Sequence, residues 1–158
     1  MNNKDPENLV HKMQEKWANI ILEIGKAYKK KISSNSLIFE LLHDVYAFDH
    51  SEVLFKPTLA KQNQFRSSKE EFISYFLGQN KVCKEDSGFA IKGWKHVFSD
   101  AKAVFLDENM ALWMGWVTLV NKDRQSTKVD KSFGFKLCKR RHLKIVLHHS
   151  SLPYQNQI

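Results

Sequence analysis

The chain has 158 residues and a formal net charge of +8 at pH 7, with 42% hydrophobic and 27% charged residues. This length and balance predict a single globular domain over residues 1–158 and exclude a disordered or collagen-like chain. Its two cysteines lack a CxxC pattern, so neither a disulfide framework nor a cysteine zinc site is supported. No apolar run reaches the roughly 20 residues of a membrane helix. We therefore expect a protein of the reducing cytosol that does not bind membranes.

The first half of the chain predicts three helices. Apolar residues recur at helical spacing over residues 5–31, where Asp5 suits the N-cap and Pro6 the first helical position. A shorter helix is expected over residues 36–45. Ser67 and Glu70 form a capping-box pattern ahead of a third helix over residues 67–77, and Gly78 suits the position after its end.

The second half predicts a sheet over residues 88–151, after a short strand at Val53 and Phe55 that has to end at Pro57. The expected strands are Phe89–Phe98, Ala103–Leu106, Met110–Val120, Lys128–Cys138 and Leu143 to about Ser150. Short connections favour antiparallel neighbours, so the predicted fold class is α+β.

The segment ALWMGWVTLV is apolar on both alternating faces, which is typical of a strand in the middle of a sheet. We expect the helices to cover one of its faces. A partner subunit is expected to cover the other face in a two-fold homodimer.

Basic residues are concentrated between residues 122 and 144, where nine Lys or Arg stand against Asp123 and Asp130. Such a stripe can bind nucleic acid, but no helix-turn-helix or RNP-type aromatic signature accompanies it. We therefore interpret it as a solvated basic face and expect no nucleic-acid binding.

Polar residues in apolar surroundings mark the candidate site. They are Lys56 and Thr58 on either side of Pro57, Tyr75 in the third helix, and the run His148, His149, Ser150 and Ser151. Buried polar groups need partners, so these side chains bond either to one another or to a ligand in a cavity. The residues alone leave both alternatives open.

Strand parity separates the two neighbouring histidines. One face would carry Lys144, Val146, His148 and Ser150, and the other Leu143, Ile145, Leu147, His149 and Ser151. Histidines on opposite faces are poorly placed to chelate one metal ion, and no HExxH motif, nucleophile elbow or phosphate-binding glycine loop is present. We expect no metal and no cofactor, and we expect His148 to face inward with Ser150.

Six segments carry a family resemblance over about residues 17–154. They are VLFKPTLA, QFRSSKEEFISYFLG, DSGFAIKGWKHVFSDAKAVF, ALWMGWVTLVNKD, TKVDKSFGFKL and LKIVLHHSSLPY. They resemble a small bacterial and algal family that is akin to the association domain of calcium/calmodulin-dependent kinase II. Some members of that family are iota-class, metal-independent carbonic anhydrases. The resemblance implies a cone of curved antiparallel sheet around the N-terminal helices, as in nuclear transport factor 2-like and SnoaL-like proteins, with a pocket in the cone.

The family pattern also implies roles for individual residues. Thr58, Tyr75 and Ser150 would hold bicarbonate and the attacking water, and His148 or His149 would relay the proton. Secondary ligand candidates are Lys56, Ser151 and Arg66, although an arginine just before a helix cap is more often a surface charge.

Two departures from the family pattern stand beside this reading. Leu147 occupies a position where some relatives have a third consecutive histidine, and the KRRH tip is basic where relatives often have an acidic turn. The alternative function is a non-catalytic dimeric association module, or a small-ligand binder of the same fold.

Overall fold

The structure of the protein is a computed structural model that describes residues 6–78, 80, 82–138 and 142–155. Asp5, the predicted N-cap, and residues 139–141 of the basic tip lie outside the described residues. The helical elements are α1 (Pro6–Lys29), α2 (Asn35–Glu40), the π-helical turn η1 (Leu41–Val45), α3 (Lys69–Leu77) and the 3₁₀ turn η2 (Ala90–Lys92). The strands are β1 (Leu54–Lys56), β2 (His96–Leu106), β3 (Met110–Val120), β4 (Ser126–Cys138) and β5 (His142–Ser151).

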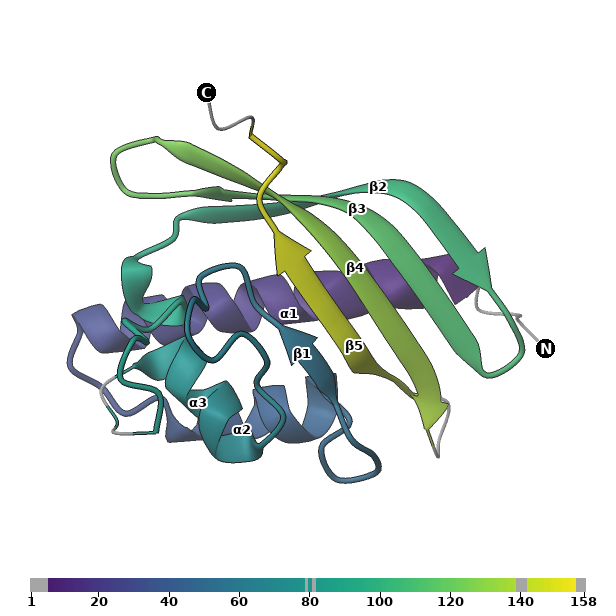
Figure 1. Cartoon of the computed structure of the whole chain (residues 1–158), viewed down its shortest axis with the longest axis horizontal. Helices are drawn as coiled ribbons and strands as arrows, with labels where there is room; N and C mark the ends of the chain where they lie inside the picture. The colour runs from purple at the N-terminus through teal and green to yellow at the C-terminus, as the bar shows by residue number, and fades with distance from the viewer. Residues whose placement is uncertain (1–5, 79, 81, 139–141, 156–158) are drawn as a thin grey trace.

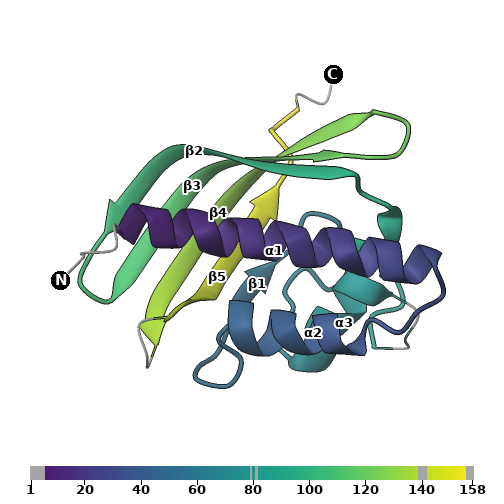
Figure 2. The same cartoon turned by 180° about the vertical axis from the view of Figure 1, so that it is seen from behind.

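The long helix α1 lies across one face of the curved sheet, and α2 and α3 gather beside its C-terminal half (Figure 1 and Figure 2). Its predicted apolar stripe faces the core, since Trp17, Ile21 and Ile24 are almost fully buried. The second predicted helix forms as α2 and continues into η1, after which Tyr46 is extended. The α+β class and the curved sheet over N-terminal helices are therefore as predicted.

The five strands form one sheet in the order β1-β5-β4-β3-β2. The four long strands are antiparallel, and the predicted inner position of Met110–Val120 is confirmed because β3 lies between β2 and β4. The antiparallel expectation is wrong for β1, which pairs parallel with β5 and places Phe55 opposite His148. The long connection between these two strands permits the parallel direction.

The predicted strand Phe89–Phe98 is wrong over residues 89–95. Gly88 and Gly93 have φ values of +81° and +77°, in the left-handed region, and the chain between them forms the single turn η2. This turn brings Phe89 into the core, where it is buried. The strand begins only at His96, and with one register shift it runs on through the separately predicted Ala103–Leu106.

The capping box of α3 lies one residue later than predicted. Ser68, not Ser67, accepts from the backbone of Glu71, and the Glu71 carboxylate accepts from the Ser68 backbone in return. The sequence fits both registers because Ser67 and Glu70 have the same spacing. At the other end the prediction is confirmed, because α3 ends at Leu77 and Gly78 follows as the C-cap with a φ of +62°.

Candidate active site

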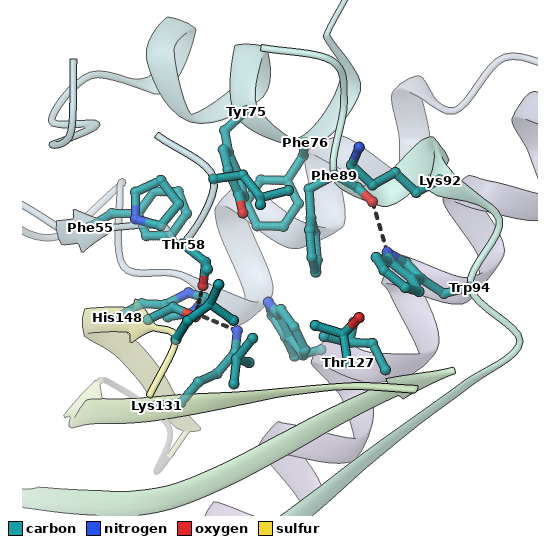
Figure 3. A pocket seen from close by; sticks show the side chains of 17 residues that line it. Phe55, Thr58, Tyr75, Phe76, Phe89, Lys92, Trp94, Thr127, Lys131 and His148 are labelled. Carbon is teal, nitrogen blue, oxygen red and sulfur yellow. Dashed lines mark hydrogen bonds between the residues drawn. The ribbon is translucent and has the colours of Figure 1, made fainter. Parts of the chain in front are cut away.

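A cavity of about 210 Å³ lies between the concave face of the sheet and the helical elements (Figure 3). Its wall is mainly aromatic and aliphatic, with contributions from Trp17 of α1, Phe55 of β1 and Phe89. The hydroxyl, amine and imidazole groups of the lining residues belong to Thr58, Tyr75, Lys92, Thr127, Lys131, His148 and Ser150. An apolar cavity with a few convergent polar groups is the usual form of a site for a small molecule.

Two hydroxyl groups that are 92 positions apart in the sequence meet in this wall. Thr58 follows β1 directly after Pro57, Ser150 comes from β5, and Thr58 Oγ1 lies 2.6 Å from Ser150 Oγ. Lys56 does not line the cavity, but its Nζ donates to the Ser150 carbonyl oxygen at 3.3 Å. The hydroxyl pair uses one of its two hydrogens internally. The other hydrogen and the remaining lone pairs are available to a ligand.

The loop that carries Thr58 is held by two carboxylates. Glu85 accepts hydrogen bonds from the backbone N–H groups of Lys61, Gln62 and Asn63. These hydrogen bonds lower the pKa of Glu85 to about 2, and the bond from Gln62 has the largest effect. Arg66, whose side chain is fully buried, is not the surface charge that its position favoured, because its Nη2 lies 2.7 Å from Asp86 and 3.4 Å from Glu85. It does not line the cavity.

Tyr75 is presented by α3 and is 6% exposed. Its ring stacks on Phe89, with ring centroids 5.6 Å apart. Burial raises the pKa of the phenol, although the Leu59 backbone donates a hydrogen bond to it. The phenol therefore stays protonated near neutral pH and can donate to a ligand.

His148 is 2% exposed, and both of its ring nitrogens are hydrogen-bonded. Nδ1 lies 2.7 Å from the hydroxyl of Tyr46, which also accepts from Trp17 Nε1 at 3.1 Å. Nε2 lies 2.8 Å from the Nζ atom of Lys131. Burial, together with the nearby Lys131, lowers the pKa of His148 well below its ordinary value. The imidazole is therefore neutral, and its orientation is fixed by partners on both sides.

Lys131 is a site residue that the sequence analysis did not single out. It is 4% exposed, although the basic stripe to which it belongs was interpreted as solvated, and that interpretation is wrong for this residue. Burial lowers the pKa of its ammonium group to about 7. Strand parity was the available signal, because Val129 and Phe133 lie two residues away on either side and face the core. Lys128 lies on the other face, over the ring of Trp116.

His149 is exposed on the outer face of the sheet, away from the cavity. Ser151 is partly exposed and does not line the cavity either.

The predicted parity of β5 holds for His148 and Ser150 but is wrong for Leu143 and Ile145, which are buried on the same side as His148. The reason is a β-bulge. Gly134 pairs with Leu147 and the next residue, Phe135, pairs with Ile145, so β5 has one extra residue between these two pairs.

Within the described ranges, no three His, Cys, Asp or Glu side chains form a group that could hold a metal ion. None of the helices that the structure describes combines the length and the apolar run needed to cross a bilayer.

Comparison with known proteins adds three similarities. Residues 8–152 match the metal-independent carbonic anhydrase family. A metal-independent carbonic anhydrase from Nostoc sp. strain PCC 7120 is 36% identical over 152 residues, which are 94% of this chain and 74% of that protein. An iota-carbonic anhydrase from a cyanobacterium, solved in complex with bicarbonate, is 33% identical with a TM-score of 0.91, over 99% of this chain and 97% of that one.

More distant structures share the fold alone. A protein of the calcium/calmodulin-dependent kinase II association-domain type from Xanthomonas campestris is 18% identical, with a TM-score of 0.59 over 94% of this chain and 89% of that one. A nuclear transport factor 2-like protein from Pseudomonas putida shares the fold as well. The predicted fold relationship is therefore confirmed.

Proposed function

Because the chain belongs to the metal-independent carbonic anhydrase family, we propose that its cavity interconverts carbon dioxide and bicarbonate without a metal ion. The observation that carries this proposal is the Thr58–Ser150 hydroxyl pair, which lines a mainly apolar cavity together with Tyr75. The bicarbonate complex of the cyanobacterial relative supports a small anion as the ligand. The two free thiols, Cys83 and Cys138, support action in a reducing cytosol.

In the proposed reaction, the apolar wall accommodates neutral carbon dioxide and the hydroxyl pair orients a water molecule toward its carbon. The water oxygen forms the new C–O bond, and one C=O π pair becomes a lone pair on the product oxygen. Thr58, Tyr75 and Ser150 stabilise this developing negative charge by hydrogen bonds that strengthen along the reaction. The released proton enters the buried network that contains His148, whereas His149 on the outer face takes no part.

The metal-free character of the reaction can be tested on protein treated with a strong chelator. We expect stopped-flow measurements to find accelerated carbon dioxide hydration, and we expect added zinc to leave the rate unchanged. The physical reason is that hydroxyl groups and a buried base replace the metal-bound water of zinc enzymes. Activity that disappears on chelation and returns only with zinc contradicts the proposal.

We also propose a two-fold homodimer through the outer face of the sheet. On β3, Trp113 and Val117 are buried, but Met114 on the opposite face is 59% exposed and Leu112 is 41% exposed. With Phe105 and Leu147 these side chains line an apolar groove that the described residues leave open. Exposed apolar surface of this extent is typical of a protein interface.

Light scattering at micromolar concentration is expected to give the mass of a dimer. Met114→Glu places a charge in the apolar groove and is expected to give a monomer, because a buried unpaired carboxylate opposes association. The matched control is Asn19→Glu on the exposed side of α1, which is expected to remain dimeric. A monomeric wild-type protein at this concentration contradicts the proposed dimer.

A further inference from the structure

The cavity wall contains a buried amine without an acidic partner. Lys131 lies directly across from Ser150 in the β4–β5 pair, and both side chains line the cavity. Among the ion pairs of the described residues, none joins Lys131 to a carboxylate. A buried ammonium group without a counter-ion is costly, so this position favours an amine that is neutral in the resting protein.

The partners of Lys131 suit both of its protonation states. Neutral His148 has one donor and one acceptor nitrogen, so it can donate from Nδ1 to Tyr46 and accept from Lys131 at Nε2. The amine has a hydrogen for this bond whether it is charged or neutral. The Lys131 Nζ atom also lies 4.3 Å from the centre of the Trp17 ring, which favours a positive charge once one forms.

We propose that Lys131 Nζ accepts the proton of the attacking water, and that Trp17, Tyr46 and His148 position it for this step. This inference rests on the proposed function. As the water oxygen bonds to carbon, its O–H bond breaks and the proton goes to the nitrogen lone pair. One C=O π pair moves to oxygen, which leaves bicarbonate beside an ammonium group, and the ammonium later loses its proton to solvent.

The other charged and titratable groups around the cavity are less suited than Lys131 to accept the proton of the attacking water. Tyr75 on α3 has a raised pKa and stays a donor. Lys92 on η2 is exposed and bonds to Ser87 Oγ. No Asp or Glu is among the cavity-lining residues that the structure describes. The lowered pKa of Lys131, about 7, is near neutral pH, and a general base is most effective when its pKa lies near the pH of the reaction.

Two substitutions separate a base from a fixed charge and from a packing residue. Lys131→Met keeps an unbranched apolar side chain without the amine. Lys131→Arg keeps a positive charge, but the guanidinium group does not lose its proton near neutral pH and so cannot act as a base. We expect each to lower kcat for carbon dioxide hydration by about 10²-fold or more. We also expect Lys131→Arg to bind ¹³C-bicarbonate about as tightly as the wild type. The matched control is Lys128→Met on the other face of β4, which is expected to keep wild-type activity.

The wild-type protein supplies a second measurement in case either variant does not fold. Its kcat is expected to rise with pH through one ionisation near 7, because the neutral amine is the active form. The ¹³Cε chemical shift of Lys131, which reports deprotonation of the amine, is expected to change over the same pH range. An active Lys131→Met or Lys131→Arg variant overturns the inference, and so does a Lys131 that stays charged throughout the rise in activity. A wild-type protein without hydration activity overturns the proposed function instead.

Discussion

Replacing Ser150 by alanine is expected to lower kcat/KM for carbon dioxide hydration by about 10²–10³-fold. The substitution removes one member of the Thr58–Ser150 pair, whose oxygens lie 2.6 Å apart, and with it a donor to the developing oxyanion. Thr58→Val removes the other member at nearly constant volume and is expected to have an effect of the same order. Stopped-flow kinetics and thermal melting of each purified variant measure the loss of activity and the change in stability.

The matched control is His149→Ala, because His149 neighbours Ser150 on β5 but is exposed on the outer face. It is expected to keep wild-type activity. If the hydroxyl pair serves only to satisfy buried polar groups, Ser150→Ala should instead lower the free energy of unfolding by about 1–3 kcal/mol and leave kcat/KM unchanged. That pattern contradicts the proposed role of the pair.

Arg66→Met is expected to lower the free energy of unfolding by about 3–5 kcal/mol, because it leaves a buried carboxylate without its counter-charge. The side chain of Asp86 is 1% exposed and lies 2.7 Å from the guanidinium group. Chemical denaturation followed by circular dichroism measures this loss. Adding Asp86→Leu to the Arg66→Met variant is expected to recover part of it, because both charges are then removed.

Lys69→Met serves as the surface control, since Lys69 forms a solvent-accessible ion pair with Asp49 at 3.4 Å. It is expected to cost less than about 1 kcal/mol. A loss of stability in Arg66→Met no larger than in Lys69→Met shows that the buried pair does not hold the fold. Arg66 Nη1 also donates to the Asn63 carbonyl oxygen, so the pair is tied to the loop that carries Thr58.

Local patterns in the sequence were sufficient for much of the fold. The helical spacing of Trp17, Ile21 and Ile24 requires one buried face, and the structure provides it. The inner position of the strand Met110–Val120 also follows from the sequence, because apolar residues on both faces are typical of a strand inside a sheet. The family resemblance then predicted the curved sheet over the helices, which spacing alone does not specify.

Other features depend on contacts between distant segments and have no local signal. The parallel pairing of Phe55 with His148 joins residues 93 positions apart, and the bulge that follows Ile145 reverses the parity of β5. Tyr46, which holds His148 Nδ1, follows a π-helical turn that the apolar spacing does not reveal. Lys131 is different, because its parity with Val129 and Phe133 was visible but its charge suggested solvent exposure.

The most direct test of the account is the exchange of ¹⁸O between carbon dioxide and water, measured by mass spectrometry at chemical equilibrium. It compares chelator-treated wild-type protein with the double variant Thr58→Val, Ser150→Ala. The account predicts fast catalysed exchange by the metal-free wild type and nearly uncatalysed exchange by a folded double variant. Equal exchange rates for the two proteins contradict the claim that this cavity performs the reaction.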